Sequence, residues 1–405
     1  MSKVVVIGGG ASGLVASIFA RKKGNEVILL ERNNSCGKKI LITGNGRCNY
    51  WNMDQDLSHY HSTDKDILES IMTTNNQERV LTFFESIGII PKIKNGYCYP
   101  FSNQASSIKM SLLREAELQG VIIKNNFLVN TIKKENNMFI ISSDNDVVRA
   151  DSLILATGSC AAPTTGSDGM GYKFATNFGH SLIPVLPSLC SLIGNGNYFK
   201  KWSGVRTDVE ISLYSDNKFY KKEIGEIQLT DYGISGICTF NLSSFASILL
   251  NQKEDVYVEI NFIPFIKDKI SFYSFLEKQS NLKYKNISEL LEGILNYKLV
   301  DVILRENNIN SNINYYDLSD SDKDKLFNLL TKFHLDIIET SGYDKAQVCS
   351  GGIPLTEVNP NTMESKKETG LYIVGELLDV NGDCGGYNLS FSWISGMLAG
   401  IHVGE

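Results

Sequence analysis

The sequence predicts an α/β fold, and three patterns along the chain lead to that prediction. Residues 4–32 have the pattern of a strand, a helix and a second strand. The middle of the chain, residues 189–343, alternates like β-strands at first and is then helical. Residues 344–405 return to the opening pattern, with a short apolar strand that ends in glycine and leads to an apolar helix. Strands and helices that alternate in this way are typical of a sheet covered by helices.

The opening unit carries a glycine-rich turn. Four β-branched residues, Val4 to Ile7, run directly into GGGASG at 8–13, and Glu31 follows the second strand at 26–30. In this G-x-G-x-x-G spacing the first glycine permits the tight turn, the second lets the backbone approach a diphosphate, and the third lets helix and strand pack closely. Free N–H groups and the helix dipole at the helix start favour an anion. Because strand, helix, second strand and acid occur in register, we predict a dinucleotide-binding unit and not an ordinary glycine turn.

Composition excludes several classes of function. The chain has 405 residues, 42% of them hydrophobic, and a formal net charge of −6. This length allows two or three domains, and the acidic balance argues against nucleic acid as the main partner, since phosphate binding requires clustered Lys and Arg. No apolar run approaches the roughly 18–20 residues that cross a bilayer, and the apolar start is interpreted as a strand and not as a signal peptide. We therefore expect a cytoplasmic protein with no membrane partner.

Cysteines and histidines show no metal-binding spacing. The eight cysteines contain no C-x-x-C pair, which excludes a zinc ribbon and the adjacent dithiol of disulfide reductases, so free thiols are expected. His59 and His61 form the one close pair among the five histidines, and no third ligand lies near them in sequence. We expect no metal site.

A glycine-rich, cationic segment follows Glu31. In residues 33–52 three glycines alternate with Lys38, Lys39 and Arg47, too densely for a regular helix or strand. Its charge and its free backbone N–H groups suit a phosphate or the edge of a flavin, although a solvated basic loop would have the same composition. Its place directly after the predicted ribose-binding strand favours a cofactor.

Helices and strands alternate up to a composition change at Pro184 and Pro187. DSLILATG at 151–158 is predicted to be a short buried strand beside the first one, with Ala-Thr-Gly close to the cofactor. Residues 65–87 and 106–118 have helical patterns, the second with a cap expected near Ser106 and preceded by an aromatic turn. Further strands are expected at 121–124, 126–133 and 138–142.

The middle of the chain reads as a small β domain and then a helical one. VRTDVEISLYS, KFYKKEIGEIQLT and VYVEINFIP are the clearest strand patterns between 191 and 263. Residues 267–339 read as helical, with amphipathic runs at 270–278, 288–304 and 321–340.

The last segment carries a second candidate site. GLYIVG at 370–375 is a short apolar strand ending in glycine, followed by Glu376, Asp379 and a glycine turn into an apolar helix. A carboxylate placed there can accept hydrogen bonds from ribityl hydroxyls. The helix start near Asn388 can offer N–H groups to a flavin carbonyl.

Taken together, these motifs resemble one family over essentially the whole chain. It is the family of FAD-binding oxidoreductases with aminoacetone-oxidase-like (YhiN-like) and bile-acid-reductase-like members, the BaiN/RdsA type. The matching stretches are VVIGGGASGLVAS, GKKILITGNGRCN, YPFSNQASS, LILATGS, TGSDGMGY and GLYIVGELLDVNGDCGGYNLSFSWISGMLAG. Two stretches depart from the family pattern: Ser159 replaces a usual glycine, and Thr230–Gly236 lacks a usual histidine, so no role of that histidine is carried over.

The resemblance implies a three-part architecture with tightly but non-covalently bound FAD and a small-molecule substrate. An FAD domain built from 1–188 and 344–405 would be interrupted by a β-barrel-like domain at 189–265 and a small helical domain at 266–343. By motif, the glycine turn would hold the pyrophosphate, Glu31 the adenosine ribose and the cationic loop the flavin side, with Asp379 at the ribityl chain and Gly386–Leu389 at the isoalloxazine ring. The residues implied to bind the cofactor are Gly8, Gly10, Ala11, Ser12, Gly13, Glu31, Arg32, Lys38, Lys39, Thr43, Gly44, Arg47, Cys48, Asn49, Val129, Ala156, Thr157, Gly158, Gly375, Glu376, Asp379, Gly386, Tyr387, Asn388 and Leu389.

The predicted function is that of an FAD-dependent oxidoreductase with hydride transfer through flavin N5. The substrate is expected in a cleft between the FAD domain and the inserted domains, since ligand sites favour such interfaces. N–H groups at Gly386–Leu389 would stabilise the negative charge that reduced flavin carries near N1. Tyr99, Tyr387 and His180 are candidates for proton transfer, but each is more often structural, so we assign no catalytic acid.

The electron donor stays open at this point. No second G-x-G-x-x-G with strand and acid follows, so either NAD(P)H docks transiently over the flavin, or the substrate reduces the flavin and oxygen reoxidises it. The first case describes a reductase of an enone such as a steroid or bile acid, which we favour, and the second an oxidase of a small amine such as aminoacetone. A flavin-containing RNA-associated module is a third hypothesis, opposed by interleaved acidic residues in the helical insert. The sequence predicts neither the substrate itself nor the oligomeric state.

Overall fold

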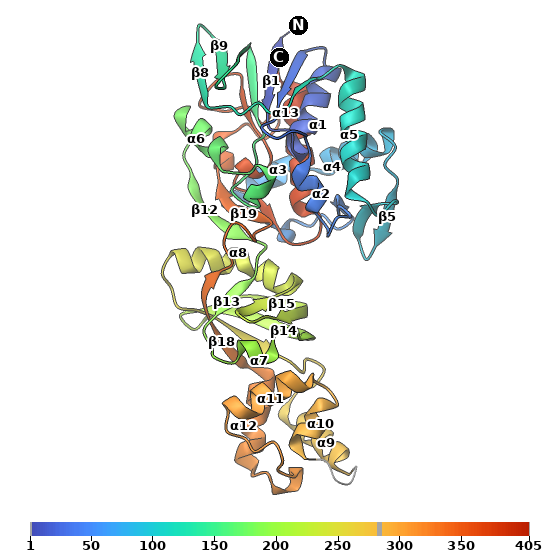
Figure 1. Ribbon diagram of the computed structural model, residues 1–405, viewed down its shortest axis with the longest axis vertical. Coiled ribbons are helices and arrows are strands. Elements are labelled where there is room, and N and C mark those ends of the chain that lie inside the picture. The colour runs from blue at the N-terminus through green and yellow to red at the C-terminus, as the bar shows by residue number, and fades with distance from the viewer. Residues whose placement is uncertain (1, 282–285, 405) are drawn as a thin grey trace. The chain divides into compact units, whose positions relative to one another are not determined.

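A computed structural model describes residues 2–281 and 286–404 of the chain, which form two compact units (Figure 1). The first unit contains the residues up to Leu186 together with those from Gln347 onward, and the second contains Pro187–Ala346. Both ends of the chain therefore belong to one unit.

The centre of the first unit is a five-stranded parallel sheet. Its order is β20 (Leu371–Ile373), β11 (Ser152–Leu155), β1 (Lys3–Ile7), β2 (Glu26–Leu30) and β7 (Ile122–Lys124). The pairs Val4–Ser152 and Leu153–Leu371 show that β11 lies between the first strand and a strand from the end of the chain. β1, β2, β11 and β20 are mostly buried apolar runs, as expected of parallel strands covered on both faces, whereas the edge strand β7 is partly exposed. The predicted α/β fold class, with β11 beside β1, is confirmed.

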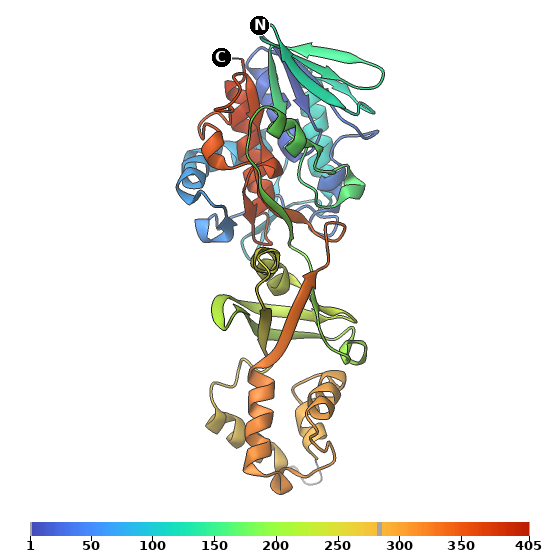
Figure 2. The same ribbon diagram turned by 90° about the vertical axis from the view of Figure 1, so that its left-hand side faces the viewer.

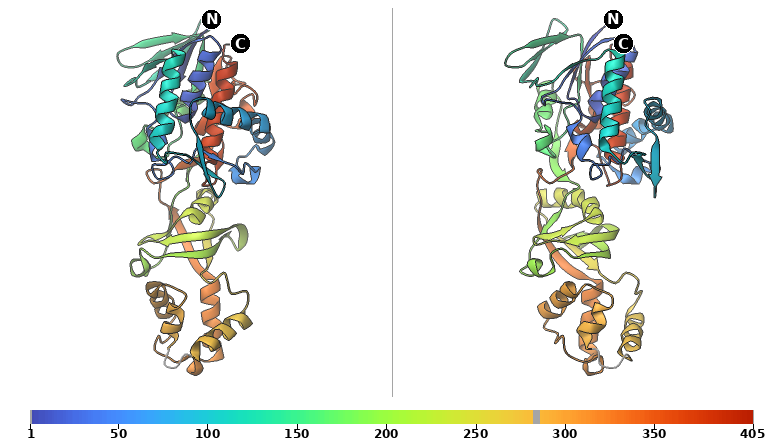
Figure 3. Two further views of the ribbon diagram at one scale, coloured as in Figure 1. Left: turned by 90° about the vertical axis from the view of Figure 1, so that its right-hand side faces the viewer. Right: turned by 45° about the vertical axis from the view of Figure 1, so that its right-hand side comes forward.

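Three long helices pack beside one another on this sheet (Figure 3). They are α1 (Ala11–Lys22), α5 (Ala105–Gln119) and α13 (Tyr387–His402). α1 and α13 come close because glycines lie where they meet: a Cβ at Gly396 would be 2.4 Å from the carbonyl oxygen of Ser12, and one at Gly400 would be 2.4 Å from that of Ala16. The other α-helices and strands of this unit, of which β12 extends two residues beyond it, are α2 (Lys38–Ile42), β3 (Trp51–Asn52), β4 (Tyr60–His61), α3 (Lys65–Ile71), α4 (Thr74–Ser86), β5 (Pro91–Lys94), β6 (Tyr97–Pro100), β8 (Thr131–Glu135), β9 (Met138–Ser142), β10 (Val147–Ala150), α6 (Met170–Asn177), β12 (Ile183–Ser188), β19 (Val348–Gly352) and β21 (Asn381–Gly382).

Several predictions in the first unit were wrong in detail. The pattern at 65–87 is two helices, because Thr73 caps the start of α4 by accepting a hydrogen bond from the N–H of Asn76. The cationic segment at 33–52 contains the short helix α2, and the aromatic turn contains the strand β6. α5 begins one residue before Ser106 and has no side-chain cap. Residues 126–130 lie outside a strand, since Asn126 adopts a positive φ of 56° and β8 starts only at Thr131.

The second unit is a closed six-stranded antiparallel barrel followed by helices. The barrel order is β13 (Leu192–Gly194), β16 (Gly233–Ser235), β15 (Lys218–Leu229), β14 (Arg206–Ser215), β17 (Val256–Asn261) and β18 (Phe333–Thr340). The inserted β-barrel is therefore confirmed. The helices of this unit are α7 (Phe199–Trp202), α8 (Ile237–Asn251), α9 (Lys269–Ser280), α10 (Ile287–Glu292), α11 (Tyr297–Glu306) and α12 (Asp320–Thr331).

Two elements of the second unit differ from the prediction. β18 closes the barrel where the amphipathic pattern at 321–340 predicted one continuous helix, and Figure 2 shows this strand in orange running on from α12. The alternation of buried Phe333, Leu335 and Ile337 with exposed residues is a strand pattern, but it is too short to separate from the helix before it. α8 lies in a stretch that we read as strands only.

Barrel and helices share one hydrophobic core. Ile211 and Val258 of the barrel belong to the same buried cluster as Leu290 and Leu330 of the helices. The division of this unit into domains at 189–265 and 266–343 stays a prediction. Among the described residues, no helix is long and apolar enough to cross a membrane.

Candidate cofactor and active site

The glycine turn after β1 forms a cradle at the start of α1. Gly8 has a φ of +104°, and a Cβ there would lie 2.3 Å from the carbonyl oxygen of Ala156. A Cβ at Gly13 would lie 1.9 Å from the carbonyl oxygen of Gly8. The fold itself therefore requires these two glycines. A Cβ at Gly10, in contrast, would meet no heavy atom within 4 Å, so the chain leaves room for a diphosphate at the helix start.

Glu31 ties the end of β2 to this turn. Its side chain is buried, and Oε2 accepts a hydrogen bond from the N–H of Gly9 at 2.8 Å. Oε1 accepts from the N–H and from the side-chain amide of Asn33, both at 2.7 Å. A carboxylate oxygen has two lone pairs, so Oε2 retains capacity for a ribose hydroxyl.

Arg32 and Lys38 bind protein groups near Glu31. Arg32 forms an ion pair with Asp168 and donates to the carbonyl oxygen of Gly166 at 3.2 Å. Lys38 donates from Nζ to Oδ1 of Asn33 at 3.0 Å. The predicted cations are therefore not all directed at one common binding site.

Lys39 joins the loop to the last part of the chain. Its Nζ lies 2.7 Å from Oε2 of Glu376, and Oγ of Ser159 donates to the same oxygen at 2.7 Å. Tyr172 donates its hydroxyl to the carbonyl oxygen of Glu376 at 3.0 Å. The sequence reasoning did not include Ser159, although its departure from the family pattern marked the position.

The loop that ends at Cys48 is held by its own backbone. The N–H of Cys48 donates to the carbonyl oxygen of Thr43 at 3.0 Å, and Gly44 and Cys48 have positive φ values of 55° and 58°. Burial raises the pKa of the Cys48 thiol to about 12, so it stays protonated. The guanidinium of Arg47 lies 4.9 Å from the centre of the Tyr99 ring, a cation–π contact that orders both side chains.

Two polar atoms of the predicted site are buried without a partner. They are Oδ1 of Asn49 and Oγ1 of Thr157, which have no hydrogen-bond partner among the described residues. Buried polar atoms are nearly always paired, and an unpaired one requires an explanation such as an absent water or bound group; outside the predicted site, Oγ of Ser188, Ser341 and Ser350 are also unpaired. The open position at Gly10 and the free hydrogen-bonding capacity of Asn49 suit a bound dinucleotide, while Oγ1 of Thr157 also packs against Gly171 of α6, where a Cβ would lie 1.8 Å away.

Replacing Thr157 tests this interpretation. We expect the free energy of unfolding of FAD-free Thr157→Val to equal that of the wild type or to exceed it by up to about 2 kcal/mol, because the change removes an unpaired buried hydroxyl. The stabilisation that added FAD provides should fall. Thermal unfolding with and without FAD measures both effects. In the control Thr239→Val, a hydroxyl bonded to the carbonyl oxygen of Ser235 is lost, so stability should fall equally in both states. If Thr157→Val instead lowers the stability of the FAD-free and of the FAD-bound protein by the same amount, the interpretation is wrong.

The end of the chain contributes Gly375 and Asp379. A Cβ at Gly375 would lie 2.6 Å from Oγ of Ser12, which brings the second glycine turn against the first helix. Asp379 is buried, and its Oδ2 accepts hydrogen bonds from the N–H and the hydroxyl of Thr63 at 2.9 and 2.6 Å. Thr63 was not predicted to take part, because no motif in the sequence marks it.

The start of α13 combines a tight turn with a stacked ring pair. Gly386 caps the helix with a φ of 99°, and a Cβ there would lie 2.9 Å from the backbone of Trp51. The side-chain amide of Asn388 donates to and accepts from the backbone of Gly382, both at 2.8 Å, so this side chain holds the turn. Tyr387 is buried and stacks on His59, with ring centres 4.6 Å apart. Of the other predicted residues, Val129 is buried, Ala11 and Leu389 are half-buried, and Gly158 has a φ of 76°.

His180 is buried and is held by Glu357 and Ser365, an arrangement that we call the His180 clamp. It is separate from the glycine turn after β1. Its Nδ1 is 2.9 Å from Oε2 of Glu357, and its Nε2 is 2.7 Å from Oγ of Ser365. Burial lowers the pKa of His180 below its ordinary value of 6.5, although Glu357 acts in the opposite direction. Burial alone would raise the pKa of Glu357, but hydrogen bonds from Ser181 and His180 bring it below 4.5.

This clamp predicts a pH-dependent stability. Both groups have folded pKa values below their unfolded ones, so the folded state binds fewer protons and loses stability as the pH falls. The loss from His180 should begin as the pH falls through about 6.5, and that from Glu357 below about 4.5. The free energy of unfolding, measured between about pH 8 and about pH 4, should show both steps. In His180→Gln the upper step should disappear; its persistence would contradict this assignment.

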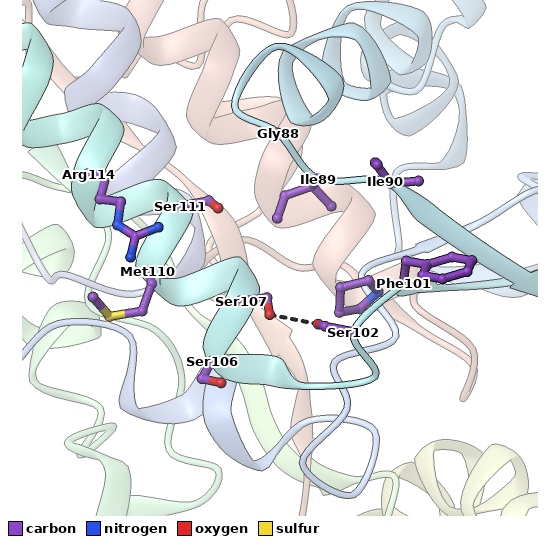
Figure 4. A pocket seen from close by; sticks show the side chains of 11 residues that line it. Gly88, Ile89, Ile90, Phe101, Ser102, Ser106, Ser107, Met110, Ser111 and Arg114 are labelled. Atoms are coloured by element: carbon purple, nitrogen blue, oxygen red, sulfur yellow. Dashed lines mark hydrogen bonds between the residues drawn. The ribbon is translucent and has the colours of Figure 1, made fainter.

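One groove of the first unit lies apart from these residues (Figure 4). It measures about 420 Å³ and runs between Gly88–Ile90, Pro100–Ser102 and the first turns of α5. The hydroxyls of Ser102 and Ser107 are hydrogen-bonded there at 2.6 Å. None of the residues predicted to bind the cofactor lines this groove.

Comparisons with known proteins cover the full chain. The family model described as HI0933-like protein Rossmann domain matches residues 2–402. A 3-dehydro-bile acid delta(4,6)-reductase from Clostridium scindens is 38% identical over 407 residues, 100% of both chains. A ribosomal RNA dihydrouridine synthase from Escherichia coli is 27% identical, covering 96% of this chain and 95% of that protein. The 3-ketosteroid-delta4-(5alpha)-dehydrogenase structure from Rhodococcus jostii RHA1 covers 100% of this chain and 97% of its own at a TM-score of 0.52 and 15% identity, which is a likeness of fold alone.

Proposed function

Since the chain belongs to the HI0933-like Rossmann-domain family and is an FAD-dependent oxidoreductase, we propose that it reduces a C=C bond conjugated with a carbonyl group. NAD(P)H is the proposed hydride donor, and a steroid or bile-acid-like enone the proposed substrate class. One observation carries this proposal: the full-length relative at 38% identity is named a reductase of a 3-dehydro bile acid.

The residues of the first unit support the binding part of the proposal. The open position at Gly10 and the free helix start suit the pyrophosphate, and Oε2 of Glu31 suits the ribose. The unpaired oxygens of Asn49 and Thr157 suit polar atoms of the flavin. The remaining predicted residues are assigned to the same cofactor by motif.

The proposed reaction needs orientation and electrostatics from the chain. Bound FAD supplies the hydride chemistry. The pairing of Lys39 with Glu376 keeps this part of the site near neutral charge, while N–H groups at the start of α13 favour negative charge on an adjacent group. The stack of Arg47 on Tyr99 places a cation at the edge of the loop.

A second candidate function is the reduction of uridine in RNA. Two relatives, from Escherichia coli and Haemophilus influenzae, are named ribosomal RNA dihydrouridine synthases. The chemistry is related, because the uridine C5=C6 bond is also conjugated with a carbonyl group. A nucleic-acid partner, which we did not expect from the composition, is therefore the alternative. Acidic residues outnumber basic ones within 266–343, which does not favour RNA binding there.

Anaerobic mixing tests these proposals. NADH or NADPH should bleach the visible absorption of the FAD-loaded protein, and a 3-oxo-Δ4 steroid should then restore it. If aminoacetone bleaches the flavin and neither nicotinamide does, the amine-oxidase alternative replaces the reductase. If a ribosomal RNA fragment restores the colour and steroids do not, the RNA alternative replaces the steroid substrate.

A further inference from the structure

Four titratable side chains form a continuous chain beside the start of α13. Nε2 of His59 lies 3.4 Å from Oδ2 of Asp54, and Nδ1 of the same ring lies 3.4 Å from Oδ2 of Asp383. The other oxygen of Asp383, Oδ1, lies 2.9 Å from Nε2 of His61. Carboxylate and imidazole therefore alternate, so that each group can accept a proton from one neighbour and pass one to the next.

This series of side chains begins at the surface and passes through a buried carboxylate. The side chain of Asp54 is 64% exposed and that of His59 is 33% exposed. Asp383 is only 9% exposed and His61 19%. A proton taken up by Asp54 therefore has a path past the buried carboxylate that needs no bulk water.

The backbone fixes this arrangement next to the proposed flavin site. β4 pairs with β21, with Asn381 opposite His61, and the N–H of Asp383 donates to the carbonyl oxygen of His59 at 2.9 Å. Asp383 is in the turn that leads to Gly386, the cap of α13. The His59 ring stacks on Tyr387, the first residue of that helix.

The neighbouring groups do not compete for the proton. Burial raises the pKa of Tyr60 and of Tyr387 well above their ordinary value of 10, so both stay protonated. Asp56 is exposed, and hydrogen bonds from Ser58 lower its pKa. Tyr97 is also close enough to influence Tyr387. Within the part of the chain that the structure describes, no cluster of three His, Cys, Asp or Glu side chains could hold a metal ion.

We propose that Asp54, His59, Asp383 and His61 form a proton relay that serves the reductase site, an inference that rests on the proposed function. Reduction of a conjugated double bond by NAD(P)H consumes one proton from solvent. The C=C π bond breaks, the β carbon gains hydride and the α carbon gains the proton, while NAD(P)H is oxidised to NAD(P)⁺. The four residues are positioning residues: His61, whose side chain is 19% exposed, passes the proton to a water molecule in the site, and that water protonates the α carbon. The two contacts of 3.4 Å have the length common in enzymes without bound substrate, and such contacts shorten on binding.

Replacing single members of the relay should slow one half of the reaction only. In Asp383→Asn and His61→Gln, the enone-dependent return of the flavin absorption should slow by about 100-fold, because general acid catalysis contributes about that much. Bleaching by NAD(P)H, which takes hydride alone, should keep its wild-type rate. The slowed step should gain a larger solvent deuterium isotope effect and recover on addition of imidazole. His334→Gln is the matched control, because His334 pairs with Asp336 at 2.7 Å on the exposed side of the second unit.

A second readout does not depend on turnover. The Cε1–H signals of His59 and His61 are assigned by their loss in His59→Gln and His61→Gln. At one fixed pH, His61→Gln should shift the His59 signal when Asp383 is present and leave it unchanged in an Asp383→Asn background. A His59 signal that His61→Gln does not shift when Asp383 is present would overturn the relay, as would variants with wild-type rates in both half-reactions or with equal losses in both. Wild-type protein that NAD(P)H bleaches but no enone reoxidises would instead refute the proposed function, and the relay with it.

Discussion

Gly10→Val should weaken FAD binding strongly while the protein still folds. Gly10 has φ and ψ values of −83° and −160°, which any residue adopts, and its Cβ would meet no protein atom within 4 Å. The valine side chain would instead occupy the space at the start of α1 where the pyrophosphate is proposed to lie. We expect the free energy of FAD binding to become less favourable by at least about 3 kcal/mol, a loss of roughly 100-fold in affinity, because charge-assisted hydrogen bonds to the diphosphate cannot form.

Titration of the apo protein with FAD measures this effect, and circular dichroism checks the fold. Gly13→Val is the matched comparison from the same turn, since its Cβ would lie 1.9 Å from the carbonyl oxygen of Gly8. That variant should fail to fold. If Gly10→Val binds FAD like the wild type, the diphosphate does not lie in this cradle.

Gly396→Val should prevent the first unit from folding. A Cβ at this position would lie 2.4 Å from the backbone oxygen of Ser12, and no side-chain rotation relieves a contact with backbone. α13 would have to move away from α1, which opens the core on the sheet. We expect a destabilisation of about 4 kcal/mol or more, the range of severe core disruption.

Chemical denaturation measures this loss. Ile401→Val in the same helix is the control: it removes one methylene from a half-buried side chain and should cost only about 1 kcal/mol. A loss for Gly396→Val no larger than that of the control would show that the two helices tolerate a wider separation, and that the two ends of the chain are not held by this contact.

The sequence was informative wherever a local pattern has a single physical meaning. The glycine turn predicted β1, α1 and β2, because strand, turn and helix require these residue types at these spacings. The apolar run at 152–155 predicted a buried parallel strand for the same reason. Short elements with mixed patterns were less predictable. β18 is only about two helical turns long, so its pattern could also continue the helix before it. Its partner strands β13 and β17 are far away in sequence.

The candidate site shows the same division. The turn formed by Gly8, Gly10 and Gly13 and the place of Glu31 beside it could be predicted from the sequence, since they follow from backbone geometry within one βαβ unit; their contacts with the cofactor stay a prediction. The contact of Lys39 with Glu376, the hydrogen bonds of Thr63 to Asp379 and the bridging of His59 and His61 by Asp383 could not. Each joins residues more than 300 positions apart, so no local pattern records it.

The sequence by itself determined the fold class, the dinucleotide motif and the family resemblance, because these depend on local spacing and on residues whose backbone requirements are narrow. Only the tertiary structure decided which side chains share a site. It showed that Gly10 is the open glycine of the turn, that Asn49 and Thr157 carry unpaired buried oxygens, and that His180 belongs to a separate clamp. The physical reason is that burial and hydrogen-bond partners depend on where distant segments meet, and here the two ends of the chain meet in one unit.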